Sequence, residues 1–300
     1  SRITVAEADE YDRSFHWLQP WIAVITSADP DHLDIYGTPE AYRESFEHFT
    51  SLIRKNGYLI LKEGVSLTPR TDATVKTFTY SESEGDFHAE NIRIGNGEII
   101  FDFVSSDSRI TDIQLGVPVK VNIENAVAAI TAAVLSGVKP DEIRAAMKTF
   151  GGAKRRFDFL LKTPGIVFID DYAHHPQELT ASIRSIRQLY PDRKVTGIFQ
   201  PHLYTRTRDF ADDFARSLSL LDDVILLDIY PAREEPIPGI TSEVIFEKIT
   251  SKEKMLLKKT ELLDFLKGKQ LDVLVTLGAG DIEHLLPAIK QLLEKRSIGK

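Results

Sequence analysis

The sequence predicts an α/β protein with two domains. Its 300 residues correspond to two domains at about 150 residues each. From residue 151 onward, strand-like and helix-like segments alternate, which is typical of a parallel doubly wound sheet. Residues 1–150 begin with the same alternation, then change at about 74–115 to a hairpin pattern that reads as an antiparallel addition. We place the domain boundary near Gly151, which gives domains at 1–150 and 151–300.

The composition excludes several classes of protein. Without cysteine there is no disulfide framework, thiolate metal site or catalytic thiol. A net charge of -8 argues against general binding to nucleic acid or a membrane surface. No apolar run reaches the roughly 20 residues that cross a bilayer, and the first residues lack a signal-peptide pattern. We expect a cytoplasmic protein that acts on small molecules, without nucleic-acid or membrane partners.

Two acidic clusters follow the first two strand patterns. Strands are expected at residues 3–6 and 21–26, and acids gather at 7–12 and 29–34. Because a strand pattern begins at residue 3 with no preceding loop, we also expect the chain to be part of a longer protein. The carboxylate oxygens beside His32 suit Mg²⁺. Proteins commonly bind this ion through one or two carboxylates together with the phosphates of a substrate. Helix capping and turn formation by Asp are the alternative for either cluster alone; the pair favours a metal.

The rest of the first domain supplies a scaffold and two amides. Residues 39–54 predict an amphipathic helix and 57–61 a strand. Asn96-Gly97 between alternating runs is a strong hairpin signal. A helix at 122–136 follows, with a second at 140–149. Asn122 and Asn125 at the start of the first helix are either caps or amide groups for the edge of a heterocycle.

The second domain opens with a basic triplet at 154–156, whose arginines suit phosphate or ribose. Strands are then expected at 166–170, 194–199, 223–229, 254–258 and 271–277. The helices expected between and after them are 176–189, 207–220, 241–250, 260–267 and 281–294.

Four of these strands end in polar loops, at residues 170–176, 200–208, 228–236 and 278–281. Parallel strands place their carboxyl ends along one edge of a sheet, where ligands bind. We therefore expect the four loops to lie together and form a site. Solvated turns without a function are the alternative for any one loop.

Familiar catalytic signatures are absent from the sequence. It has no nucleophile elbow and no H-E-x-x-H helix. Ile100 and Glu283 stand where G-x-G-x-x-G needs its last glycine, which disfavours a dehydrogenase, and no G-x-x-x-x-G-K-[ST] loop occurs. Acids, imidazoles, arginines and amides together still indicate phosphoryl transfer.

Taken jointly, eight segments resemble the Mur ligase family over essentially the whole chain. They are residues 7–12, 31–34, 122–126, 154–157, 170–176, 200–208, 230–239 and 278–281. The resemblance implies the later part of a central ATPase domain, followed by a Rossmann-like, mostly parallel doubly wound C-terminal domain. It also implies that a UDP-binding domain and the P-loop lie upstream of Ser1, so that this chain alone is inactive.

The resemblance implies ATP-dependent amide ligation in peptidoglycan synthesis. The carboxylate of UDP-N-acetylmuramate would attack the γ-phosphate of ATP, and the amine of L-alanine would displace phosphate from the acyl phosphate. Two alternatives are a ligase that attaches a tripeptide to the same sugar nucleotide and a non-catalytic nucleotide-binding module.

By the same resemblance, Glu7 would hold the Mg²⁺ that bridges the ATP phosphates, and His32 a second Mg²⁺ near the acyl phosphate. Asn122 and Asn125 would contact adenine. Val121 stands where the family often has histidine, which leaves the fine contacts to adenine open.

Further along the chain, Arg156 and Asp171 would hold the ribose and phosphate end of the nucleotide. The pocket for L-alanine and the acyl phosphate would be formed by Tyr172, His174, His202 and Arg206. Of these, the last three would be catalytic together with His32, and Arg206 would pair with the alanine carboxylate. Leu203 departs from the arginine usual at its position.

Overall fold

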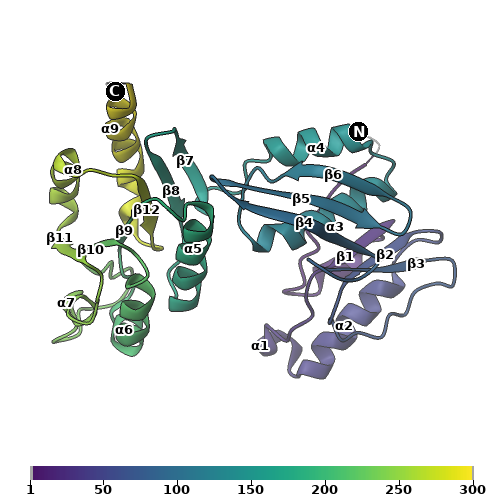
Figure 1. Ribbon diagram of the computed structural model, residues 1–300. Helices are drawn as coiled ribbons and strands as arrows, with labels where there is room; N and C mark the ends of the chain where they lie inside the picture. The colour runs from purple at the N-terminus through teal and green to yellow at the C-terminus, as the bar shows by residue number, and fades with distance from the viewer. Residues whose placement is uncertain (1–2, 299–300) are drawn as a thin grey trace. The chain divides into compact units, whose positions relative to one another are not determined.

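A computed structural model describes residues 3–298. The chain forms two compact units (Figure 1). Unit 1 comprises Ser1–Arg93, Ile100–Leu115 and Lys120–Thr149, and unit 2 comprises Ile94–Ile99, Gly116–Val119 and Phe150–Lys300. The last change of unit, between Thr149 and Phe150, lies next to the boundary expected at Gly151.

Unit 1 is built on a six-stranded sheet with the order β1-β2-β3-β4-β5-β6. β2 pairs in parallel with β1 and β3, whereas β5 and β6 are antiparallel. The expected antiparallel addition therefore extends the parallel strands in one continuous sheet. The strands are β1 (Ile22–Ile25), β2 (Tyr58–Lys62), β3 (Lys76–Tyr80), β4 (Phe87–Gly95), β5 (Glu98–Ser105) and β6 (Arg109–Gln114).

Helix α2 covers the parallel end of this sheet. Thr38 starts the helix, because its side chain accepts a hydrogen bond from the Ala41 N–H and Pro39 occupies the first turn. Tyr42, Phe46 and neighbouring apolar residues of α2 share a buried cluster with β1 and β2. The helices of the unit are η1 (Ser14–Trp17), α1 (Leu33–Tyr36), α2 (Pro39–Ser51), α3 (Val121–Leu135) and α4 (Pro140–Thr149).

The strand expected at residues 3–6 does not form. Val5 is 93% exposed, and the described sheet of unit 1 begins with β1. An apolar pattern becomes a strand only when a partner supplies hydrogen bonds and a face to bury. The hairpin prediction is right: Asn96 and Gly97 join β4 to β5 with φ values of 52° and 75°, as a two-residue primed turn requires.

Unit 2 is built on a second six-stranded sheet with the order β11-β10-β9-β12-β8-β7. Its first five strands pair in parallel, as the sequence predicts. The antiparallel edge strand β7 was not predicted. The strands are β7 (Asp158–Lys162), β8 (Val167–Asp171), β9 (Val195–Phe199), β10 (Asp223–Leu227), β11 (Glu253–Leu257) and β12 (Val273–Leu277).

Helices cover both faces of this sheet (Figure 1). Ile198 belongs to a core that includes residues of α8 and α9, whereas the next residue, Phe199, contacts Phe214 of α6 with ring centroids 5.3 Å apart. Neighbouring strand residues point to opposite faces, so the sheet is buried on both. The helices are α5 (Pro176–Leu189), α6 (Tyr204–Leu218), α7 (Glu243–Phe246), α8 (Lys259–Gly268), η2 (Asp281–Leu285) and α9 (Leu286–Ile298).

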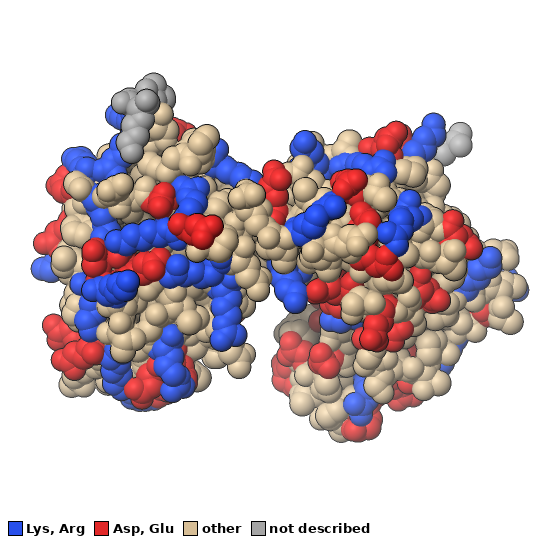
Figure 2. Space-filling model, viewed as in Figure 1, with Lys and Arg blue, Asp and Glu red and all other residues tan. Residues whose placement is uncertain are grey.

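Three of these helices depart from their expected bounds. The helix expected at 281–294 is divided into the 3-10 helix η2 and the α-helix α9, which ends at Ile298. α6 begins at Tyr204 rather than at 207, because the chain turns at Leu203, whose φ is 72°. α7 is a single turn inside the expected range 241–250. Among residues 3–298, no helix is both long and apolar enough to cross a membrane. On the visible face of unit 2, acidic and basic side chains lie interspersed (Figure 2).

Candidate active site

The four polar loops of unit 2 lie at one edge of its sheet, as predicted. They follow β8, β12, β9 and β10, which are consecutive neighbours in the sheet. The loops after β9 and β10 also pair directly, because His202 and Tyr230 form a parallel bridge. Leu203 N–H donates to the Tyr230 carbonyl at 3.0 Å. The carboxyl edge of this sheet is therefore the candidate site.

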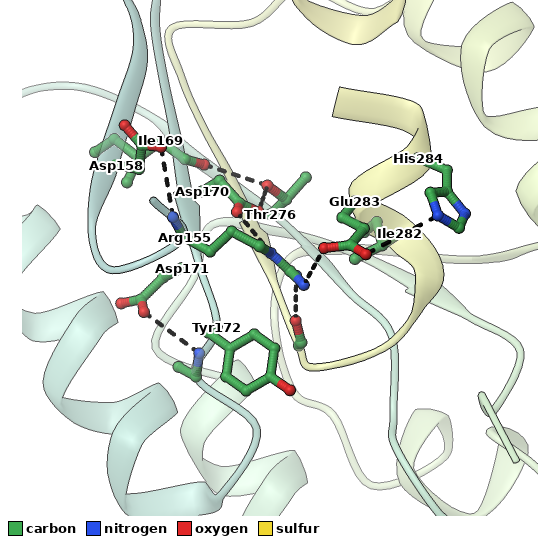
Figure 3. A network of polar contacts seen from close by, with 12 residues as sticks. Arg155, Asp158, Ile169, Asp170, Asp171, Tyr172, Thr276, Ile282, Glu283 and His284 are labelled. Carbon is green, nitrogen blue, oxygen red and sulfur yellow. Dashed lines mark hydrogen bonds and ion pairs between the residues drawn. The ribbon is translucent and has the colours of Figure 1, made fainter. Parts of the chain in front are cut away.

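Arg155 lies at the centre of a polar network at this edge (Figure 3). Its Nε donates to Asp170 at 3.1 Å, and its two Nη atoms donate to Glu283 at 2.9 Å and to the Gly278 carbonyl at 2.7 Å. The guanidinium also lies over the Tyr172 ring, 4.9 Å from its centroid. One side chain thus ties the end of β8 to the loop after β12 and supports Tyr172.

The loop after β12 is fixed from its other side by Gln200, which is buried. The Gln200 side chain donates to Asp281 at 2.9 Å and accepts from the Ile282 N–H at 2.9 Å. Gly278 and Gly280 permit this packing. A Cβ at Gly278, where φ is +125°, would lie 2.6 Å from the Gln200 carbonyl, and one at Gly280 would lie 2.4 Å from Gln200 Oε1.

The two carboxylates at the end of β8 have different surroundings. Asp170 is buried, and it accepts from the Thr276 hydroxyl at 2.6 Å as well as from Arg155. Burial raises the pKa of Asp170, and the Thr276 hydrogen bond and Arg155 oppose that rise. Burial also raises the pKa of Asp171. The Ala173 N–H donates to Asp171 Oδ1 at 3.3 Å, and hydrogen bonds from Ser182 and from the Phe157 backbone also oppose the rise. Both carboxylates at the end of β8 are thus held by neighbours within the fold.

The four residues predicted to form an amino-acid pocket come together. The Tyr172 and His174 rings lie 5.3 Å apart, and the His174 and His202 rings 6.3 Å apart. Arg206 Nη1 approaches His202 Nδ1 at 3.5 Å. His202 also stacks on Tyr230 at 5.8 Å, which sequence reasoning did not assign to the pocket.

Two glutamates order the backbone around these side chains. Glu178 accepts from the N–H groups of His174 and His175 at 2.9 and 3.0 Å. Although burial opposes it, these bonds lower the pKa of Glu178. Glu234 accepts from the hydroxyl and the N–H of Thr205 at the start of α6, and these bonds lower its pKa. Burial, followed by the charge of Arg206, lowers the pKa of His202, so this ring favours its neutral form.

In unit 1, His32 lies among carboxylates. Its Nε2 is 3.7 Å from Glu10 Oε1 and 3.8 Å from Asp31 Oδ2, and Tyr11 packs edge-on against its ring at 5.0 Å. Glu7 is exposed, and within residues 3–298 no hydrogen bond or ion pair joins it to His32. In that same part of the chain, no three His, Asp or Glu side chains form a ready metal site.

Asn122 and Asn125 are the second and fifth residues of α3, and neither is its cap. The cap position is Lys120, which makes no side-chain capping bond. The two asparagines contact each other, with Asn125 Nδ2 donating to Asn122 Oδ1 at 3.3 Å. The capping alternative is therefore wrong, and their role as adenine ligands stays a prediction.

Arg155 is the main residue that sequence reasoning missed. The basic triplet was identified, but its role was assigned to Arg156, which is exposed. Nothing in the triplet distinguishes the two arginines; the left-handed backbone at Arg155, φ 62°, turns one inward and leaves the other outward. A structural role for Gln200 could have been suspected, because an uncharged polar residue directly followed an apolar strand.

Comparison with known proteins identifies the family. The profile of the Mur ligase middle domain matches residues 2–133, and that of the Mur ligase glutamate ligase domain matches residues 155–280. The chain belongs to the Mur ligase family. Its fold agrees: a crystal structure of UDP-N-acetylmuramate-alanine ligase from Thermotoga maritima superimposes with a TM-score of 0.74 at 25% identity, over 98% of this chain and 63% of that one.

Two Mur ligases of known name are more similar in sequence. The chain is 63% identical to the UDP-N-acetylmuramate--L-alanine ligase of Parabacteroides distasonis, with 99% of this chain and 64% of that protein aligned. It is 60% identical to the enzyme of the same name from Phocaeicola vulgatus, with 99% of this chain and 65% of that protein aligned. The chain thus spans slightly less than two thirds of the length of these relatives.

Proposed function

We propose that this Mur ligase chain serves the ATP-dependent ligation of L-alanine to UDP-N-acetylmuramate, a step of peptidoglycan synthesis. The observation that carries the proposal is the convergence of Tyr172, His174, His202 and Arg206 at one sheet edge. The names of the relatives at 63% and 60% identity supply the substrates. ATP is a cytoplasmic substrate, so the reaction belongs in the cytoplasm.

The cluster in unit 2 suits an amino acid and an acyl phosphate. Arg206 offers a planar fork of donors that matches the carboxylate of L-alanine. The aromatic rings of Tyr172 and Tyr230 give the site apolar walls. The two imidazoles offer hydrogen-bond donors and acceptors to a bound substrate.

Mg²⁺ fits the donor set around His32 as a metal shared with phosphate groups. Mg²⁺ is commonly held by one or two protein carboxylates, with phosphate oxygens and water completing its shell. Glu10 and Asp31 next to His32 supply hard oxygens, and Glu7 is an exposed carboxylate in the same acidic segment. We assign Glu7 and His32 to metal binding, with Glu10 as an addition from the structure. When bound, Mg²⁺ neutralises phosphate charge.

Nucleotide contacts complete the proposed assignment. The paired amides of Asn122 and Asn125 present donors and acceptors suited to the edge of adenine. Arg156 is exposed, as a ligand for phosphate or ribose must be before binding. Asp171 ends β8 at the edge where the polar loops meet, and its carboxylate would accept from ribose hydroxyl groups. These four roles rest on the resemblance between their segments and the Mur ligase family.

The test is a ligation assay on the natural protein that contains these residues. It is incubated with ATP, Mg²⁺ and UDP-N-acetylmuramate plus either L-alanine or the tripeptide, and the amide product is identified by mass spectrometry. L-alanine as the acceptor supports the proposal. Turnover with the tripeptide alone would favour the related peptide ligase, and nucleotide binding without any amide product would favour a binding module.

A pair of arginine variants ties the activity to the cluster. Arg206→Gln removes the proposed partner of the alanine carboxylate and should raise the KM for L-alanine. Arg208→Gln is the matched control on the same helix, because Arg208 is exposed and pairs with Asp209. Equal effects of the two substitutions on the KM for L-alanine would show that the cluster around Arg206 does not bind the alanine carboxylate.

A further inference from the structure

The two histidines of the cluster are hydrogen-bonded in opposite ways. Their ring centroids lie 6.3 Å apart at 74°, so they share one site in an edge-to-face arrangement. Each Nδ1 atom has a different kind of neighbour. A neutral imidazole carries its proton on only one nitrogen, and the partner of one nitrogen decides the state of the other.

His174 faces acceptors through Nδ1. This atom lies 3.0 Å from the Tyr172 carbonyl oxygen and 3.4 Å from Glu178 Oε2. Neither oxygen has a proton to give when Glu178 is ionised, so Nδ1 carries the proton. The lone pair is then on Nε2, which has no hydrogen-bond partner among residues 3–298. Because Glu178 is fixed by two backbone N–H groups, it can also stabilise the ring when Nε2 gains a proton.

His202 faces a donor through Nδ1, because Arg206 Nη1 lies 3.5 Å away. A guanidinium has no acceptor, so Nδ1 must supply the lone pair and Nε2 carries the proton. Burial lowers the pKa of His202 most, Arg206, His174 and Arg233 lower it further, and Glu234 opposes them. His202 is thus a neutral ring that offers an N–H.

We propose that His174 is the general base of amide formation and that His202 is the hydrogen-bond donor to the oxygen that gains charge. This division of roles rests on the ligation proposed above. The amine nitrogen of L-alanine forms a bond to the acyl carbon, and His174 Nε2 takes the proton that the amine loses. His202 Nε2–H stabilises the oxyanion of the tetrahedral intermediate. The C–O bond to phosphate then breaks, and the departing phosphate receives the proton that His174 held.

The opposite assignment places like groups against each other. A lone pair on His202 Nε2 would put the ring proton on Nδ1, facing an N–H of Arg206. A proton on His174 Nε2 would leave a lone pair on Nδ1 facing a carbonyl and a carboxylate. Each change replaces a donor–acceptor contact with a repulsive one. The hydrogen bonds of both rings therefore favour the same division of roles.

Glutamine separates the two roles, because its side-chain amide can replace an Nε2–H donor but not a base. In the natural protein, His174→Gln should lower the rate of alanine ligation by about 100-fold or more. His202→Leu has no hydrogen-bond donor at this position, and its rate of alanine ligation should fall by about 100- to 1,000-fold. The rate of alanine ligation by His202→Gln should be at least about tenfold higher than that by His202→Leu.

Hydroxylamine provides a readout that a merely structural role would not change. It is largely uncharged near neutral pH and attacks acyl phosphates without a base. His174→Gln should therefore still form the hydroxamate while failing to ligate alanine, whereas His202→Leu should lose both. Two results would overturn the proposal: alanine ligation by His174→Gln within about tenfold of the unsubstituted protein, or equal rates for His202→Gln and His202→Leu.

Nitrogen-15 NMR of the histidine rings in the unsubstituted 300-residue chain tests the tautomers without any turnover. The expected result is a proton on Nδ1 of His174 and on Nε2 of His202. The reverse tautomers would refute the inference even if ligation is found. The expected tautomers in a protein that ligates no alanine would instead refute the proposed function.

Discussion

Arg155 and Asp170 form an ion pair that is almost closed to solvent. Their side chains are 16% and 1% exposed, and Arg155 Nε lies 3.1 Å from Asp170 Oδ2. The other Asp170 oxygen accepts from the Thr276 hydroxyl of β12. Both oxygens of a buried carboxylate are thus satisfied, which is the condition under which such a charge is tolerated. Through Asp170, this network joins β8 to β12 at the sheet edge that carries the candidate site.

Arg155→Leu should strongly destabilise unit 2. The substitution leaves Asp170 buried without its cation, which typically costs about 3–5 kcal/mol. The double variant Arg155→Leu/Asp170→Asn should lose less than the sum of the two single variants, because it removes both charges. Urea unfolding followed by circular dichroism measures the free energy of unfolding.

Tryptophan fluorescence supplies the internal control for this experiment. Trp17 and Trp21 are the only tryptophans of the chain, and both belong to unit 1. The fluorescence transition should therefore stay in place while the circular dichroism transition of unit 2 moves to lower urea. Additive effects in the double variant would mean that Arg155 and Asp170 are not coupled.

The loop after β12 should not tolerate a side chain at either glycine that faces Gln200. Gly278→Ala brings a Cβ to 2.6 Å from a backbone oxygen at a φ of +125°, and Gly280→Ala brings one to 2.4 Å from Gln200 Oε1. We expect each to cost about 1–3 kcal/mol, as overpacking in a core does, and Gly278→Ala to cost more because backbone cannot move aside. Thermal unfolding measures both.

Gly268→Ala is the matched control for the loop substitutions. Its Cβ would meet no atom within 4 Å, and Gly268 ends helix α8. Alanine there should be neutral or stabilise by about 0.4–1 kcal/mol. If all three substitutions shift the melting temperature alike, close packing against Gln200 is not what the two loop glycines provide.

The sequence predicts the second sheet well because its strands are buried on both faces. β9, β10 and β12 consist of fully buried residues, so their apolar runs are unbroken and their polar ends are sharp. β7 was missed because it is an edge strand with half-exposed residues. The pattern at residues 3–6 was read as a strand because local propensity does not reveal whether a partner strand is present.

The candidate site was predicted as a set of residue types more reliably than as a set of contacts. Placing Tyr172, His174, His202 and Arg206 together needs only the rule that parallel strands end at one edge. Distinguishing Arg155 from Arg156 needs the backbone conformation, which turns on a single positive φ. The tautomers of the histidines depend on their contacts with a backbone carbonyl and with neighbouring side chains, which no sequence pattern encodes.

Glu178 should make stability depend on pH in a defined direction. Its pKa in the folded chain lies below 4.5, so its ionised form stabilises the fold. That contribution is complete above about pH 4.5 and is lost as the pH falls through the folded-state pKa. Glu178→Gln should therefore cost about 1 kcal/mol at pH 7, the usual value of a helix cap. The difference from the unsubstituted chain should shrink below pH 4.5.

Urea unfolding at pH 7 and at pH 3.5 measures this difference. Glu294→Gln on helix α9 is the control, because Glu294 is half-exposed and its partner Lys290 is 3.9 Å away. It should have little effect at either pH. A cost for Glu178→Gln that is the same at both pH values would show that the charge of Glu178 does not support the start of α5.

The 300-residue chain by itself should neither hydrolyse ATP nor ligate L-alanine. Phosphoryl transfer needs groups that surround the β- and γ-phosphates, commonly a Gly-rich loop with its lysine. No G-x-x-x-x-G-K-[ST] segment occurs in these residues, and their only Gly-Lys pairs are at 268–269 and 299–300. Phosphate release from ATP should stay at the level of buffer, with or without UDP-N-acetylmuramate and L-alanine. Turnover that Arg206→Gln abolishes would show instead that residues described here suffice to hold the phosphates.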